Sequence, residues 1–364
     1  MRRVKGNIPD SMEILQPEET EAIAPPAMLP GTIERIRDTD ARSNLAEQLS
    51  HITSDRMKHR SVVRLTYRNA VVAPDGFATW RDGVRFGEGL LADAIWAPME
   101  EAPVLRYPIE GISRAYFGHW LIDALAACFI DPDAGALMLP DPGIAHVAAS
   151  RGAMLMGVAT GRSATLARRQ TAGKKWHAEA YKDIFGLKPV DAPLVLAEEL
   201  ITYRDHGQGS HKRARYQKMR QIMNARFTET IPSEGVFIRR GGAGLARTIL
   251  NEDEICDQLA ARGWTILNIA DVSVEELYAH IHGTKVVVGL DGSQLSHAVL
   301  MLPDDGSLVL LTPPDRFTAV IIDHCRGARL GSGFVLLEGA DGQYRADLDA
   351  ILATVDIARA QQQG

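Results

Sequence analysis

The sequence predicts an α/β protein with two domains. At ~100–200 residues per domain, a chain of 364 residues exceeds what one hydrophobic core usually serves. From residue 235 onward, short β-branched runs alternate with helical patterns at roughly twenty- to thirty-residue intervals, which is typical of βαβ units around a parallel sheet. Hydrophobic residues at 46% and charged residues at 24% are close to globular averages, which excludes a fibrous or mostly disordered chain.

Charge and cysteine content narrow the class of protein. Forty Lys and Arg against 46 Asp and Glu give a net charge of -6, which offers no overall field for nucleic acid or anionic lipid. Cys128, Cys256 and Cys325 are far apart and form no CxxC pair, so we expect reduced thiols rather than disulfides or zinc ligands. No signal peptide or membrane span is recognisable. We therefore expect a cytoplasmic protein with no nucleic-acid partner and at most peripheral membrane association.

Residues 1–58 are expected to form an irregular, Pro-rich N-terminal arm laid over the body, with a disordered tail as the alternative. Only the stretch 41–52 has the pattern of a short helix. Five prolines interrupt any longer element: Pro9, Pro17, Pro25, Pro26 and Pro30.

Residues 59–230 are assigned to a first domain. Alternation over 61–74 predicts a hairpin or small meander, and the apolar stretch 116–129 predicts a buried helix. We also expect a helix that ends at Gly186 and a strand over 192–201. The interval 151–200 as a whole alternates helix and strand signals.

The segment 211–227 carries six Lys and Arg residues and no acid. Tyr216, Met219, Met223 and Phe227 follow helical spacing, so the segment predicts an amphipathic helix with a basic face. A solvated face is the ordinary interpretation, and a phosphate-facing surface is the alternative.

Residues 231–340 are assigned to a second, Rossmann-like domain, and residues 341–364 to a C-terminal helix that begins near Tyr344. Asn251 is expected to cap one helix, and Ser273 with Glu276 forms a capping box for another. The strands are expected at 235–240, 264–270, 285–290 and 307–311.

Two loops at strand ends carry the chemistry of an anion site. Arg239 and Arg240 precede a Gly-rich turn at 241–244, and Asp291 begins a turn that opens a helix. Ligands of open parallel sheets bind at the carboxyl ends of strands, where glycines allow close backbone approach and arginines hold phosphate. Neither loop has the dinucleotide fingerprint or a Walker sequence, which disfavours a nicotinamide-dependent oxidoreductase.

His119 and Asp123 are four residues apart on the predicted helix and therefore share a face. A carboxylate can fix the tautomer of a His and raise its basicity, which suits a general base. The alternative is a satisfied His in the core. The sequence Asp131-Pro132-Asp133 is formally D-x-D, but aspartates are ordinary in a Pro-rich turn, and we expect no metal there.

The motifs resemble one known family. VFIRRGGAGLARTILNEDEI, then VSVEEL and VVVGLDGSQLSH, resemble the carboxyl-terminal half of glycosyltransferase family 61, whose pattern contains R-x-x-x-N-E-D-E. Upstream, LTYRNAVVAPDG and YFGHWLID resemble the opening hairpin and the aromatic-His-Trp-x-x-Asp helix of bacterial members. The similarity extends over about 62 to 315.

The resemblance implies a GT-B fold, in which two Rossmann-like domains face each other across a cleft and the second holds the donor. It implies an inverting, metal-independent hexosyl- or pentosyltransferase with no cofactor, which takes a nucleotide-sugar, by resemblance UDP-linked, to a glycan or glycolipid acceptor in bacterial surface polysaccharide biosynthesis. His119 or Asp123 is then the base. The residues expected to bind the donor are Arg239, Arg240, Arg247, Asn251, Glu252, Asp291, Gly292, Ser293 and Gln294.

The sequence departs from the family pattern at several positions. Asp291 stands where the family usually has His, and Leu277 where it usually has Gln. Ser293 and Gln294 replace common small residues. Asp291 is therefore expected to contact a ribose or sugar hydroxyl, or the donor differs from the usual one. The alternative function is a catalytically inactive sugar- or nucleotide-binding homologue.

Overall fold

The computed structural model of the chain separates into two compact units. One comprises residues 1–19 and 60–207, and the other residues 20–59 and 208–364. The expected break near residue 230 thus lies about twenty residues earlier, and the N-terminal segment is divided between the units. The residues described are 8–40, 43–74, 76–81, 84–88, 99–108, 113, 116–140, 142, 177–240 and 247–363. The predictions for the Gly-rich turn at 241–244 and for most of 151–176 lie outside them.

The C-terminal unit contains the predicted parallel sheet. Its strand order is β12-β10-β13-β14-β15, and every neighbouring pair is parallel. The order 2-1-3-4-5 is that of a doubly wound sheet, whose direction of winding reverses between the first and third strands, here β10 and β13. The bounds are β10 (Val236–Arg239), β12 (Thr265–Asn268), β13 (Val286–Leu290), β14 (Ser307–Thr312) and β15 (Gly331–Leu336).

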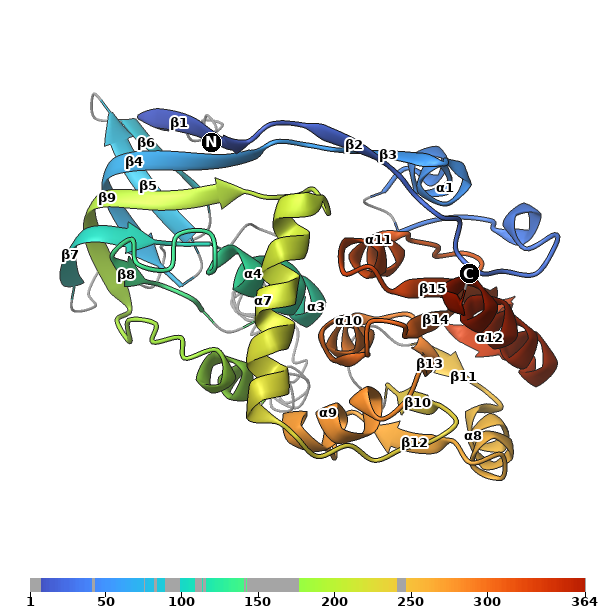
Figure 1. Cartoon of the computed structure of the whole chain (residues 1–364). Helices are drawn as coiled ribbons and strands as arrows, with labels where there is room; N and C mark the ends of the chain where they lie inside the picture. The colour runs from blue at the N-terminus through green and yellow to red at the C-terminus, as the bar shows by residue number, and fades with distance from the viewer. Residues whose placement is uncertain are drawn as a thin grey trace, which may run out of the picture. The chain divides into compact units, whose positions relative to one another are not determined.

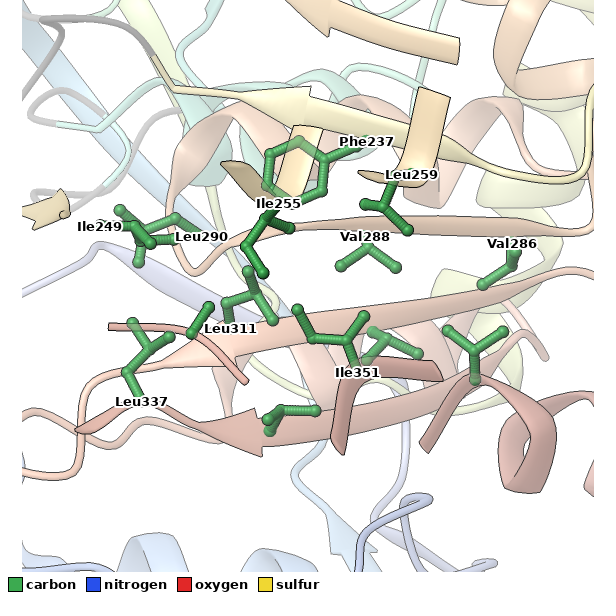
Figure 2. Close-up of a cluster of buried hydrophobic side chains, with 14 of the residues drawn as sticks. Phe237, Ile249, Ile255, Leu259, Val286, Val288, Leu290, Leu311, Leu337 and Ile351 are labelled. Atoms are coloured by element: carbon green, nitrogen blue, oxygen red, sulfur yellow. The ribbon is translucent and has the colours of Figure 1, made fainter. Parts of the chain in front are cut away.

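Helices cover both faces of this sheet (Figure 1). One face packs on α8 (Glu252–Ala260) and α12 (Leu348–Gln363), while α9 (Val274–His282), α10 (Ser296–Met301) and α11 (Val320–Gly327) lie on the other. Figure 2 shows the apolar side chains of β13 and β14 in contact with those of α8 and α12. Burial on two faces explains why these strands are continuous apolar runs rather than alternating ones.

Of the helix caps predicted for this unit, one is confirmed and one is not. Ser273 and Glu276 form the predicted capping box at the start of α9. Asn251 precedes α8, but its side chain makes no capping bond. Its amide instead donates to the carbonyl of Ala346 at 2.8 Å and accepts from the Ala346 N–H at 3.0 Å. The sequence did not predict α11, β15 or a small sheet of β11 (Thr248–Ile249), β16 (Glu338–Ala340) and β17 (Gln343–Arg345).

The N-terminal unit is built on a mixed seven-stranded sheet. The predicted hairpin is present, but β1, β5 and β9 all run antiparallel to β4, and only β7 pairs in parallel with β9 and β8. The expectation of a Rossmann-like first domain is therefore wrong for the described strands, because most of their pairings are antiparallel, whereas a Rossmann-like sheet is mostly parallel. The bounds are β1 (Ser11–Gln16), β4 (Val62–Ala73), β5 (Gly76–Arg81), β6 (Val84–Glu88), β7 (Met99–Arg106), β8 (Ala136–Leu137) and β9 (Leu194–Arg204).

Other predictions for this unit are confirmed. A helix over 177–184 ends at Gly186, whose φ of 63° is the left-handed conformation that glycine adopts at little cost. The buried helix near residue 120 is also present, and it consists of α3 (Phe117–His119), a π-helical turn (Trp120–Ala124) and α4 (Leu125–Ala127).

Residues 20–59 belong to the C-terminal unit and combine short regular elements with irregular stretches. They contain the short helix that was expected near 41–52, and also a two-stranded sheet. The bounds are β2 (Glu19–Ala22), η1 (Ile33–Arg35), α1 (Leu45–Thr53) and β3 (Arg56–His59).

The basic helix is α7 (Ser210–Arg226), which packs with α10 and α11 in the C-terminal unit. Its basic side chains form a solvated face only in part, since Lys212, Arg215 and Arg220 are buried whereas Lys218 and Arg226 are exposed. Arg220 donates to the carbonyls of Val299 and Leu302 at the end of α10, at 3.3 Å and 2.6 Å. The guanidinium of Arg220 therefore satisfies backbone carbonyl groups inside the unit.

We expect the stability of the C-terminal unit to depend on His51. His51 of α1 lies 2.5 Å from the carboxylate of Asp323 in α11, and this hydrogen bond raises the pKa of His51 above its ordinary 6.5 in spite of partial burial. The stabilisation is complete below pH 6.5 and is lost as the pH rises through the raised pKa. His51→Gln should therefore lower the Tm by about 1–2 °C at pH 6 and by less at pH 9. An equal loss at both pH values, measured by calorimetry, would contradict this assignment.

None of the helices within the described ranges combines the length and the hydropathy that crossing a membrane requires.

Candidate functional site

Charged side chains gather at the carboxyl edge of the sheet in the C-terminal unit. Arg240 directly follows β10, Asp291 directly follows β13, and Arg316 lies in the loop after β14. Arg247 leads into β11, and Figure 1 shows β10, β13 and β14 side by side. Because the sheet reverses its winding between β10 and β13, Arg240 and Asp291 lie at the position where doubly wound sheets bind ligands.

Burial and mutual repulsion define the electrostatics of this arginine cluster, by which we mean Arg240, Arg247 and Arg316 around Asp291. Arg240 is only 8% exposed, and burial together with the charge of Arg247 lowers its pKa to about 10. Burial also lowers the pKa of Arg247, which Arg316 lowers further. For Asp291, burial raises the pKa although all three arginines oppose the change. The cluster thus holds like charges that its own carboxylate compensates only in part.

Two guanidinium nitrogens in the cluster are buried without a hydrogen-bond partner among the described residues, namely Nη1 of Arg240 and Nε of Arg247. A buried cationic donor without an acceptor is costly, so such groups are usually satisfied by a ligand or an ion. Guanidinium groups at a ligand-binding edge match the oxygens of a phosphate or diphosphate. The arrangement can therefore bind a phosphorylated anion.

The guanidinium of Arg239 contacts helix α8 rather than the arginine cluster, although Arg239 directly precedes Arg240 in the chain. Its guanidinium donates to Glu252 at 3.2 Å and to Asp253 at 2.6 Å in the first turn of α8. Burial opposes the charged form, but the hydrogen bond to Asp253 and the charge of Glu252 raise the pKa of Arg239. Arg239 and Glu252 thus belong to a partly exposed ion-pair network. Asn251 is engaged separately, by the two hydrogen bonds between its side chain and the backbone of Ala346.

The turn after β13 serves largely to shape the backbone. The Gln294 amide donates to the carbonyl of Leu290, and a Cβ at Gly292 would meet Oε1 of Gln294 at 2.6 Å. Gly292 therefore leaves room for the Gln294 side chain, and Ser293 between them is partly exposed. Leu277 is fully buried in α9, so it contributes packing there.

His119 and Asp123 form the candidate catalytic pair of the N-terminal unit. Nδ1 of His119 lies 2.8 Å from Oδ2 of Asp123, and the two side chains are 21% and 22% exposed. The pair spans a π-helical turn, a feature that is frequent at functional sites. Trp120 anchors the turn, because its buried indole N–H donates to the carbonyl of Pro140 at 2.8 Å. A proton held on Nδ1 by Asp123 makes Nε2 the basic nitrogen of His119.

The D-x-D sequence has a structural role at its first carboxylate. Asp131 accepts a hydrogen bond from the Tyr203 hydroxyl at 2.9 Å and forms an ion pair with Arg64 at 2.5 Å. Burial and this hydrogen bond raise the pKa of Tyr203. Asp131 therefore links β4 and β9 rather than offering itself to a ligand.

Arg316 is the member of the cluster that was not predicted from the sequence. The strand-end rule that selected Arg240 and Asp291 applies equally to the loop after β14, and it would have found Arg316 had it been used there. Asp40, which forms an ion pair with Arg316 at 2.5 Å, has no comparable signal because it lies far away in the sequence.

Comparison with known families matches residues 117–308 to the family described as Glycosyltransferase 61. The match covers more than half of the 364 residues, and it includes His119, Asp123, Arg240, Arg247 and Asp291. Among curated proteins we found no match.

Proposed function

The chain belongs to glycosyltransferase family 61, and from this premise we propose that it transfers a sugar from a nucleotide-sugar donor to a hydroxyl group of a glycan or glycolipid acceptor. The C-terminal unit is assigned to the donor and the N-terminal unit to deprotonation of the acceptor. A GT-B architecture, an inverting reaction, a UDP-linked donor and a role in surface polysaccharide synthesis in the cytoplasm all belong to this proposal.

The arginine cluster is the observation that carries the proposal. A nucleotide-sugar presents a diphosphate, and its leaving group gains negative charge as the bond to the sugar breaks. Arg240 and Arg247 have buried nitrogens that lack acceptors within the described residues, and they lie at the ligand-binding edge of the sheet. Such preorganised positive charge stabilises a departing diphosphate without a metal ion, because the donors need not reorganise during the reaction.

The pair in the N-terminal unit supplies the complementary chemistry. In an inverting transfer, a base removes the proton of the acceptor hydroxyl while its oxygen attacks the anomeric carbon. Nε2 of His119 takes that proton, the new glycosidic bond forms, and the nucleoside diphosphate leaves with the electrons of the broken bond. Asp123 stabilises the imidazolium through its contact with Nδ1.

Asp291 gives the donor site its own character. A carboxylate beside a diphosphate would repel it, but Asp291 interacts with three arginines that offset its charge. Its burial favours a contact with a hydroxyl of the donor's ribose or sugar, to which either protonation state of the carboxyl group can form a hydrogen bond. The departure from the family pattern at this position also motivates the second candidate function, a homologue that binds the donor without turnover.

A panel of nucleoside diphosphates and nucleotide-sugars separates these functions. Ligand at about one hundred times its Kd should stabilise the protein by about 2.7 kcal/mol, which gives a clear increase in Tm. Slow release of the nucleoside diphosphate from the matching nucleotide-sugar, in the absence of acceptor, would identify an enzyme. Binding without release would identify a catalytically inactive homologue. A panel in which no compound changes the Tm would overturn the donor assignment.

A further inference from the structure

We infer that Asp40 is a positioning residue for the donor site: it holds Arg316 as a third phosphate-binding arginine. This inference rests on the proposed function. It assigns residues 20–59 a part in donor recognition, although Asp40 and Arg316 both lie outside the residues that match the family.

The ion pair leaves part of the Arg316 guanidinium available. Nη2 of Arg316 donates to Oδ2 of Asp40 at 2.5 Å, and within the described part of the chain no other hydrogen bond of its guanidinium is present. The side chains of Arg316 and Asp40 are 31% and 17% exposed, so the pair is partly shielded from solvent. An arginine pinned through one nitrogen keeps its other donors for a planar, multi-point contact with phosphate oxygens.

The backbone around the ion pair is fastened on both sides. The Arg37 N–H donates to the carbonyl of Pro314 at 2.7 Å, and the Phe317 N–H donates to the carbonyl of Asp38 at 2.9 Å. The Thr39 hydroxyl also donates to the carbonyl of Phe317 at 2.6 Å. These bonds bracket Arg316 in its loop, so residues 37–40 fix both the loop and the side chain that it carries.

Proximity to the other arginines completes the argument. Arg316 interacts electrostatically with Arg240, Arg247 and Asp291, and Asp40 interacts with Arg247. Without a partner, Arg316 would be repelled by the two neighbouring guanidinium groups and would turn to solvent. Asp40 keeps it in place, and the orientation of a charged donor decides its contact with phosphate.

A double-mutant cycle tests this role. We expect Arg316→Met to raise the Kd of UDP or GDP, measured by isothermal titration calorimetry, at least tenfold. Asp40→Asn should raise it about three- to tenfold, and in the Arg316→Met background Asp40→Asn should have no further effect, because its influence passes through Arg316. Asp40→Glu should restore part of the affinity. The matched control is Asp38→Asn, which changes an exposed carboxylate that accepts a hydrogen bond from the neighbouring Thr39 N–H, and it should leave the Kd unchanged.

Other outcomes would overturn the inference. If Asp40→Asn leaves the Kd unchanged or lowers it, Asp40 is a competing counter-ion rather than a positioning residue. Additive effects in the cycle would show that Asp40 does not act through Arg316.

A further variant, Thr39→Val, loosens the same loop without changing its charge and should also raise the Kd of the nucleotide. If wild type binds no nucleoside diphosphate and Arg240→Met changes nothing, the proposed function itself fails; if only the Asp40 and Arg316 variants behave like wild type, this inference alone fails.

Discussion

Replacing Arg240 by Met should strongly reduce the stabilisation of the protein by nucleoside diphosphates while the ligand-free protein becomes more stable. The Met side chain keeps the apolar stem and removes a charge that burial and Arg247 disfavour, as the lowered pKa of about 10 indicates. Neutralising such a charge should raise the free energy of unfolding by about 1–3 kcal/mol. Loss of charge-assisted bonds to phosphate, at about 1.5–3 kcal/mol, should weaken nucleotide binding about tenfold to a hundredfold.

Melting curves with and without UDP or GDP measure both effects of Arg240→Met. The matched control is Lys285→Met, which removes an exposed cation before β13, at the opposite edge of the sheet, where Lys285 forms an ion pair with Asp305. It should change neither the ligand-free Tm appreciably nor the shift on nucleotide addition. A less stable Arg240→Met protein that still binds nucleotide would show that Arg240 serves packing rather than the donor.

His119→Ala should lower kcat about 10²- to 10⁴-fold and leave the Kd of the nucleoside diphosphate unchanged. The expected loss is that of a general base, and donor binding is assigned to the other unit. Asp123→Asn should also lower kcat, because an amide that donates to Nδ1 would leave the proton on Nε2 and remove the base. Steady-state kinetics over a range of pH, with calorimetric titration of the nucleotide, measures both quantities.

A second His–Asp pair provides the control for this experiment. His51 and Asp323 are also in hydrogen-bond contact and partly exposed, but they join α1 to α11. His51→Gln should therefore alter stability and leave turnover unchanged. Full turnover of His119→Ala would remove His119 from the mechanism, and equal losses of turnover and nucleotide binding would indicate a structural effect.

The sequence predicted the C-terminal sheet well because its signals are local. Each predicted strand is a short apolar run, and α9 carries its own start signal in the capping box of Ser273 and Glu276. His119 and Asp123 were found for the same reason, since one turn of helix brings them together. Arg240 and Asp291 were also within reach, because strand ends in parallel sheets meet at one edge.

Contacts between distant segments decided what the sequence left open. Asn251 was expected to cap its helix, but its side-chain amide forms hydrogen bonds with the backbone of Ala346 instead. Arg239 was expected to bind the donor, but Glu252 and Asp253 in the first turn of the next helix balance its charge. In both cases the residue type was compatible with several partners, and only the folded backbone determined which partner was near.

The sequence by itself determined the α/β class, the parallel sheet and the residue types of a candidate anion site, because burial patterns and strand ends depend on short stretches of chain. The tertiary structure alone decided which arginines belong to that site. It placed Arg316 and its partner Asp40 there, 276 residues apart, and it kept Arg239 outside. The physical reason is that a buried charge requires a partner, and the partner is chosen by proximity in the fold rather than by spacing along the chain.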